Sequence, residues 1–69
     1  MQKFILDGSE FIELNKLMKL LNLVESGGEA NLLIDNGELK VNGVVEKQRR
    51  KKLRSGDVVI FRTKTIQVI

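Results

Sequence analysis

The spacing of the apolar residues changes twice along the chain, and this change constrains the fold more than any other sequence feature. From residue 14 the apolar residues recur every three or four positions, which predicts amphipathic helix. Before residue 13 and after residue 38 they form short strand-like runs. The pattern predicts an α+β fold of two short helices packed on a small, mostly antiparallel sheet. The apolar face of the first helix comprises Leu14, Leu17, Met18 and Leu21.

Capping signals set the helix boundaries. We expect the first helix to end near Leu23. Ser26 is a suitable N-cap for the second helix because its hydroxyl can accept a bond from an orphan backbone N–H, and Glu29 completes a capping box. Asn36-Gly37 predicts the end of that helix, since glycine readily adopts the left-handed C-cap conformation. The buried stripe of the second helix is expected to comprise Ala30, Leu33 and Ile34.

Two turn dipeptides predict hairpins, because both dipeptides tolerate the positive φ that a tight turn requires. Asp7-Gly8 predicts a hairpin within residues 4–12, and Asn42-Gly43 predicts one within residues 39–45. The second signal is the stronger of the two.

The C-terminal third predicts two further strands. Residues 58–61 are apolar on both faces, as expected of a central strand. A turn at Thr63-Lys64 leads to a last strand at residues 66–68. Because each phenylalanine lies within an apolar strand pattern, we expect all three to pack in the core. They are Phe4, Phe11 and Phe61.

The absence of Cys and His limits the chemistry available to this chain of 69 residues. Disulfides, structural zinc, thiol nucleophiles and histidine bases are excluded. Ser26 therefore has no partner for nucleophilic catalysis, and no two carboxylates form a convincing pair in sequence. We expect one domain, residues 1–69, that is not an enzyme and uses no metal, cofactor or small-molecule substrate.

Hydropathy gives no membrane signal. No apolar run approaches the roughly 20 residues of a membrane span, and the first residues show no signal-peptide pattern. We therefore expect a cytoplasmic protein that acts as a monomer without a membrane partner.

Charge is distributed unevenly along the chain. The formal net charge is +3, but residues 1–39 carry three Lys against seven Asp and Glu, whereas residues 40–69 carry nine Lys and Arg against two acids. The two parts therefore have charges of −4 and +7. This asymmetry indicates an anionic partner for the C-terminal part.

Residues 47–54, the basic run, are the best candidate for binding that partner. Six of the eight residues are basic. An extended run of this length spans roughly 26 Å, enough to reach several phosphates of a duplex. The alternative is a solvated loop that keeps a thin-cored protein soluble, and we expect the run to be mobile without a partner. Its basic residues are Lys47, Arg49, Arg50, Lys51, Lys52 and Arg54, preceded in the chain by Lys40.

Two other groups are candidates of lower rank. Backbone N–H groups at the start of the second helix favour an anion, and the glycines of Ser26-Gly27-Gly28 would let a phosphate approach closely. A well-capped helix start explains the same residues slightly better. Lys16 and Lys19 lie one turn apart on the first helix and could extend a basic surface, although such lysines more often form only the solvated face.

The order of these elements resembles the S4 RNA-binding domain family over residues 13–60. The matching segments are 14–19, 23–30, 33–34, 37–43 and 53–58. The most specific parts are Val41-Asn42-Gly43 after a helix ending at Gly37, and Gly56-Asp57 before the last apolar strand. The Ser-Gly-Gly segment and the total length resemble the stand-alone branch of small proteins (YbcJ/YaaA-like). The resemblance implies an S4-like (alpha-L) fold and binding to structured RNA, ribosomal or ribosome-associated.

The chain departs from the S4 pattern at three positions that are basic in larger members. Glu13 stands where Arg is common, Gly27 replaces the Arg of Ser-Arg, and Asn31 stands where a basic residue is usual. We hypothesise that the basic run takes over their contact with phosphates.

The sequence therefore predicts non-catalytic binding of structured RNA through phosphate contacts and RNA shape. With neither Tyr nor Trp, stacking of bases on aromatic side chains is poorly supported. The main alternative is a protein-interaction adaptor that docks its basic run on an acidic partner. Binding of double-stranded DNA by the same charges is a third interpretation.

Overall fold

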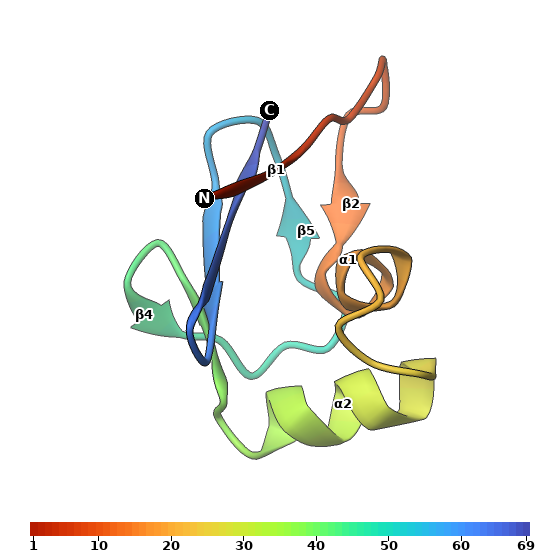
Figure 1. Ribbon diagram of the computed structural model, residues 1–69, viewed down its shortest axis with the longest axis vertical. Coiled ribbons are helices and arrows are strands. Elements are labelled where there is room, and N and C mark those ends of the chain that lie inside the picture. Colours follow the sequence, from red (N-terminus) through yellow and green to blue (C-terminus); the bar gives the residue numbers. More distant parts are fainter.

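The computed structural model describes residues 1–69 and contains two sheets and two helices (Figure 1). The larger sheet has the strand order β1-β7-β6-β3-β4, in which only the β1–β7 pair is parallel. A separate antiparallel sheet, the β2/β5 ribbon, lies beside α1. The bounds are β1 Gln2–Phe4, β2 Ile12–Glu13, α1 Leu14–Leu20, α2 Gly27–Asp35, β3 Leu39–Val41, β4 Val44–Val45, β5 Lys52–Leu53, β6 Val58–Phe61 and β7 Lys64–Val68.

The predicted α+β class is confirmed, and the core lies between the larger sheet, the helices and the ribbon. Alternate residues of β3, β6 and β7 are buried, so one face of the larger sheet packs inward and the other faces solvent. The core comprises Leu14, Leu17, Met18, Val24, Ala30, Ile34, Leu39, Val41, Leu53, Val59, Phe61, Ile66 and Val68.

Both ends of α2 form as its sequence predicts. The Ser26 hydroxyl accepts a hydrogen bond from the Glu29 N–H (3.1 Å), and the Glu29 carboxylate accepts one from the Glu25 N–H (2.8 Å). At the C-terminus, Gly37 has φ 77° and its N–H donates to the Ile34 carbonyl. Glu38 N–H donates to the Leu33 carbonyl, which completes a Schellman motif.

The first helix is shorter than predicted. It ends at Leu20, and Asn22 has φ 56°, so the chain leaves the helix before Leu23. Leu20 is 61% exposed, whereas Leu21 and Leu23 pack against the core from outside the helix. Burial of these two side chains, rather than continued helical periodicity, determines the path of the chain here.

The predicted hairpin within residues 4–12 is wrong, although its turn forms. Asp7 and Gly8 adopt φ 52° and 89°, yet the flanking strands lie in different sheets. Ile69 N–H donates to the Phe4 carbonyl (2.8 Å), which extends the parallel pairing of β1 with β7. The second hairpin is confirmed: β3 pairs with β4, and Asn42 and Gly43 have φ 53° and 84°.

The last two strands form a hairpin with β6 in the interior of the sheet, as predicted for residues 58–61. Its turn lies at Arg62-Thr63, one residue before the predicted position, because Lys64 already pairs with Phe61. Arg62 adopts φ 56° in this turn.

Candidate nucleic-acid interface

The basic run crosses from β4 to β5 and is bonded to the start of α1. Glu13 is the N-cap of α1, but its side chain makes no capping bond. Instead, Leu14 N–H donates to the Lys51 carbonyl (2.9 Å) and Asn15 N–H donates to the Arg49 carbonyl (3.1 Å). The run thus supplies the carbonyl partners that an exposed helix N-terminus lacks. These bonds anchor residues 49 and 51 of the run to α1, and the mobility of the run without a partner stays a prediction.

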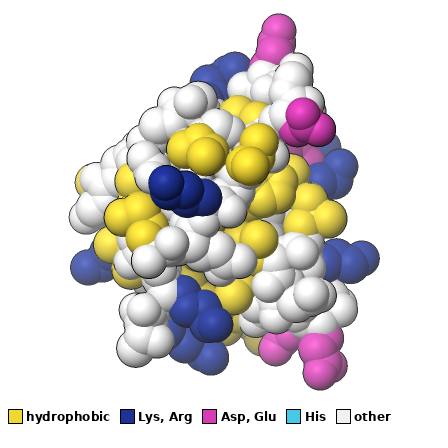
Figure 2. All heavy atoms as spheres, turned by 45° about the horizontal axis from the view of Figure 1, so that its top comes forward, with side chains coloured by type: hydrophobic (Ala, Val, Ile, Leu, Met, Phe, Trp, Pro, Cys, Tyr) yellow, Lys and Arg dark blue, Asp and Glu magenta, His cyan; other side chains and the backbone are white.

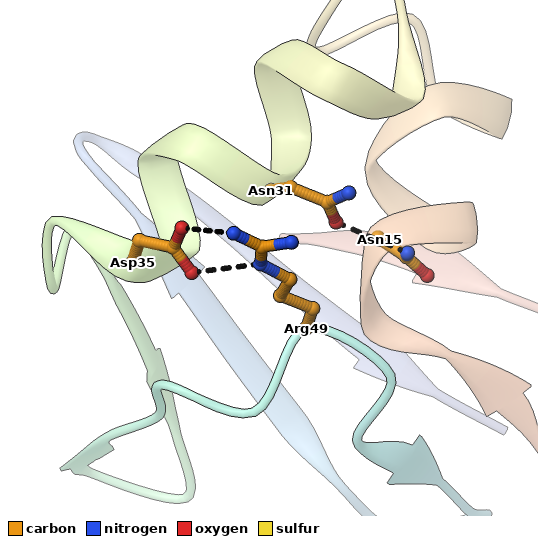
Figure 3. Close-up of polar contacts among 4 residues, drawn as sticks. All are labelled: Asn15, Asn31, Asp35 and Arg49. Carbon is orange, nitrogen blue, oxygen red and sulfur yellow. Dashed lines mark hydrogen bonds and ion pairs between the residues drawn. The ribbon is translucent and has the colours of Figure 1, made fainter.

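Two arginines of the run form ion pairs with carboxylates of the first 39 residues. Arg49 binds Asp35 at the end of α2 through two bonds, Nε to Oδ1 (2.9 Å) and Nη2 to Oδ2 (2.6 Å) (Figure 3). Arg50 Nε donates to Glu13 Oε2 (2.8 Å). The side-chain bond from Arg49 lowers the pKa of Asp35, with the guanidinium charge acting in the same direction and partial desolvation opposing both.

The other four cations of the run have no carboxylate partner within 4.0 Å. They are Lys47, Lys51, Lys52 and Arg54. Lys51 is half-buried and the other three are exposed. A cation without a carboxylate partner keeps its net charge available for an external phosphate, whereas the charges of Arg49 and Arg50 are already matched by Asp35 and Glu13.

The β2/β5 ribbon orients Lys52 and Arg54 outward. Ile12 pairs with Leu53, and Leu53 is fully buried, so the residues on either side of Leu53 face solvent. Phe11 lies on this outward face, with Lys52 Nζ 4.9 Å and Arg54 Cζ 5.7 Å from its ring centroid.

The core prediction is wrong for Phe11 and confirmed for Phe61. Phe61 is 3% exposed, and Phe4 is half-buried against the core. Phe11 is half-buried but lies outside the core cluster. Alternation along β2 is the physical reason, because Ile12 takes the inward position and its neighbour must face outward. The sequence alone could not reveal the outward position of Phe11, because that position depends on the pairing of residues 11–12 with residues 52–54.

Lys16 and Lys19 border a shallow hollow on the outer side of α1. The hollow is lined by Ile12, Lys16, Lys19, Leu20 and Asn22. Both lysines are exposed and without a carboxylate partner within 4.0 Å. Ile12 is the neighbour of Phe11 in the chain, so the hollow adjoins the ribbon.

The remaining candidates lie elsewhere. Lys40 is exposed on the outer face of the larger sheet, across from Ile60, on the side opposite the core. At the start of α2, which holds Ser26, Gly27 and Gly28, the Glu29 carboxylate folds back onto the Glu25 N–H. A negative charge therefore already lies where a phosphate would approach.

Asn31, one of the departures from the S4 pattern, contacts the other helix. Asn15 Nδ2 donates to Asn31 Oδ1 (3.2 Å), a bond that joins the two helices (Figure 3). Glu13, another departure, is the residue that binds Arg50. One arginine of the basic run therefore binds a residue at a position where the family pattern is basic.

On at least one face of the protein, the basic side chains do not form a continuous patch. Figure 2 shows a face on which most Lys and Arg side chains lie apart from one another near the margin and one lies among hydrophobic side chains, with acidic side chains at the top, upper right and lower right. Neither helix has the length or apolar composition needed to cross a bilayer. No group of three or more acidic side chains is arranged to hold a metal ion.

The S4 domain family model matches residues 4–69. "Putative RNA-binding protein YbcJ" of Escherichia coli (strain K12) is 38% identical over 69 residues, which cover 100% of this chain and 99% of that protein. "Probable ribosome maturation protein RlbA" of Bacillus subtilis (strain 168) is 37% identical over 51 residues, 74% of this chain and 72% of that protein. The chain therefore belongs to the S4 domain family.

A solved structure shows the same fold. The solution structure of E. coli YbcJ aligns with a TM-score of 0.76 and 38% identity, covering 100% of this chain and 87% of that one. It is described as revealing an αL motif involved in RNA binding. The predicted S4-like fold and the resemblance to small stand-alone members are thus confirmed.

Proposed function

We propose that this protein binds structured RNA, ribosomal or ribosome-associated, without catalysing a reaction. The observation that carries the proposal is the basic run, which holds four cations without a carboxylate partner and is attached to α1 through its backbone and to α2 through the Arg49 side chain. The names of its relatives support it, since one refers to RNA binding and another to ribosome maturation. The proposal includes action as a monomer in the cytoplasm.

The contact surface centres on the run and the outer side of α1. Arg and Lys bind phosphates differently, because Arg offers a planar fork and Lys a compact point charge. The ion pairs of Arg49 and Arg50 orient the run against both helices, and the unpaired cations meet the phosphates. The proposed phosphate-binding residues are Lys16, Lys19, Lys47, Lys51, Lys52 and Arg54.

The positions of Arg49 and Arg50 support the transfer of role from the helices to the run. Their guanidinium groups reach Asp35 and Glu13, which belong to the C-terminal end of α2 and the N-cap of α1. Positive charge thus reaches the helix pair from the run instead of from helix residues. Each pair neutralises one carboxylate that would otherwise repel phosphate.

Charge removal on the ribbon tests the proposal. We expect Lys52→Gln/Arg54→Gln to weaken binding to a ribosomal RNA hairpin by about tenfold or more at low salt, because two phosphate contacts are lost. The matched control, Lys3→Gln/Lys64→Gln, removes the same charge from the larger sheet and should change affinity less than threefold. Filter binding at equal ionic strength measures both.

Two outcomes would contradict the proposal. Equal losses in the two double variants would mean that only net charge matters. Retention of a protein partner by the wild type after nuclease treatment, with no measurable affinity for RNA, would instead favour the adaptor that docks on an acidic protein.

A further inference from the structure

Phe11 is a half-buried aromatic ring that lies outside the core cluster, on the outward face of the β2/β5 ribbon. Its neighbour Ile12 packs inward, and the partner strand buries Leu53 on the same inner side. Continuing this register places Phe11 across the ribbon from Arg54. The part of the ring that stays exposed lies beside two basic side chains on the same face, an arrangement on which the base of a nucleotide can stack.

The two cations beside the ring, Lys52 and Arg54, are close enough to contact the phosphates of a nucleotide whose base stacks on it. Lys52 and Arg54 are two residues apart on one strand, about 6.6 Å along its axis. Both lie over the Phe11 ring, at 4.9 and 5.7 Å from its centroid, so a base that stacks on the ring has to displace them from it. Both side chains are exposed and neither has a carboxylate partner; Arg54 Nη1 donates only one long hydrogen bond, to the Glu10 carbonyl (3.5 Å).

We propose that the outward face of the β2/β5 ribbon binds one unstacked nucleotide of RNA, with its base on the Phe11 ring and its adjacent phosphates on Lys52 and Arg54. This inference rests on the proposed function and deepens it. A base within a continuous duplex is covered by its neighbours and cannot reach a side chain in this way. The ligand is therefore a bulged, looped or terminal nucleotide beside a stem.

Such a site would be tolerant of sequence, because every base has a π face and the ribbon offers no array of side-chain amides to read base edges. The Arg54 guanidinium can stack as well as pair with phosphate, which adds a second planar surface. Recognition would then combine phosphate contacts with the presence of an unpaired nucleotide. Stacking on an aromatic side chain, which the composition alone supports poorly, is then part of RNA binding.

The test uses two RNA hairpins with the same stem, one with a single unpaired 2-aminopurine and one fully paired. We expect the wild type to prefer the bulged hairpin by about fivefold or more, on the order of one stacking contact. Binding should also change 2-aminopurine emission, because the base leaves the RNA stack and stacks on the Phe11 ring. Phe11→Leu should abolish both the preference and the emission change, whereas Phe11→Tyr, which keeps the ring, should retain them.

The outcomes separate this inference from the proposed function. Equal affinity of the wild type for the two hairpins, with unchanged emission, would overturn the nucleotide site while RNA binding itself stands. Absence of binding to either hairpin would overturn both. The emission of the wild-type complex decides the matter even when Phe11→Leu fails to fold, which circular dichroism of each variant would reveal.

Discussion

At the scale of single residues, Asn42 and Asp57 explain why two short family motifs occur together. Asn42 Nδ2 donates to Asp57 Oδ1 (3.0 Å), and Val58 N–H donates to Asn42 Oδ1 (2.9 Å). Asp57 Oδ2 also accepts from the Arg54 N–H (2.8 Å). The two motifs therefore form one polar clip that joins the β3–β4 hairpin to the start of β6.

Asn42→Gly isolates the contribution of this clip. Glycine retains the left-handed turn conformation, so the variant loses the side-chain bonds without adding backbone strain. We expect the free energy of unfolding to fall by about 1–2 kcal/mol, the net value of two exposed or partly exposed hydrogen bonds. Urea denaturation measures the loss.

The control for that variant is Asp7→Gly. Asp7 has nearly the same φ, 52° against 53°, but its side chain makes no hydrogen bond. Its replacement should leave the urea midpoint unchanged or slightly raised. Equal midpoint shifts in the two variants would show that the Asn42 side chain contributes nothing beyond its backbone conformation.

The Gly56-Asp57 motif is visible in the sequence, but the partners of the Asp57 side chain are not. Its bond to Asn42 spans 15 residues of sequence and depends on β3 and β6 lying side by side. The same holds for Arg49 and Arg50. Their charge is evident in the sequence, but the carboxylates that bind them lie 14 and 37 residues away.

At the scale of elements, α2 was predictable and α1 was predictable only in part. The N-cap, capping box and Schellman motif of α2 involve only residues 25–38, which are the helix and its immediate flanks. The seven-residue α1 instead receives its N-terminal partners from the basic run, and its end is set by the packing of Leu21 and Leu23. A helix too short to be stable alone depends on such tertiary contacts.

Gly37→Ala tests the C-cap of α2. Gly37 has φ 77°, and a Cβ there would make only ordinary contacts with Lys47 and Val45 at 3.6 Å. The cost is therefore conformational, and we expect a loss of about 1–2 kcal/mol in the free energy of unfolding.

Gly27→Ala is the matched control, because Gly27 lies in the first turn of the same helix with open space around its Cβ position. This variant should be as stable as the wild type or slightly more stable, since alanine favours helix. Thermal denaturation followed by circular dichroism compares the two. A Gly37→Ala variant as stable as Gly27→Ala would contradict the assigned cap.

The Asp35–Arg49 pair makes a small part of the stability depend on pH. The pKa of Asp35 is lowered in the folded protein, chiefly by the bond from Arg49. Its contribution is therefore complete above the ordinary Asp value of 3.8 and disappears as pH falls through the lowered value.

Asp35→Asn should be slightly less stable than the wild type at pH 7, and the difference should shrink toward zero as pH falls below about 4. Melting temperatures of the two proteins across this range measure it. A difference that stays constant down to pH 2 would mean that the pair does not form in solution. Because both side chains are largely exposed, the effect should also weaken with salt.

At the scale of the whole molecule, the charge asymmetry of the sequence is partly satisfied within the fold. Each of the three ion pairs joins an arginine of residues 40–69 to a carboxylate of residues 1–39. Three charges of each sign are thereby matched, and the split falls from −4 and +7 to −1 and +4. The positive charge that remains for an external anion is smaller than the sequence indicates, and most of it is on lysines.

Strand order shows most clearly what could not be predicted from the sequence. Asp7-Gly8 makes the expected turn, but a turn does not choose the partners of the strands it joins. β1 pairs with β7, and alternate residues of β7 are buried in the core. β2 pairs with β5 to form the ribbon, and Leu53 of β5 is fully buried. Pairing was predictable where a two-residue turn joins both strands directly, as in β3–β4 and β6–β7.

The salt dependence of RNA binding tests the central claim most directly. Six unpaired cations neutralising one phosphate each predict that log K falls with log salt concentration at a slope of about −5, with the duplex-DNA rule as a guide. The slope should become about 2 less steep in Lys52→Gln/Arg54→Gln. A wild-type slope near zero, or the same slope in both proteins, would contradict phosphate binding by the basic run.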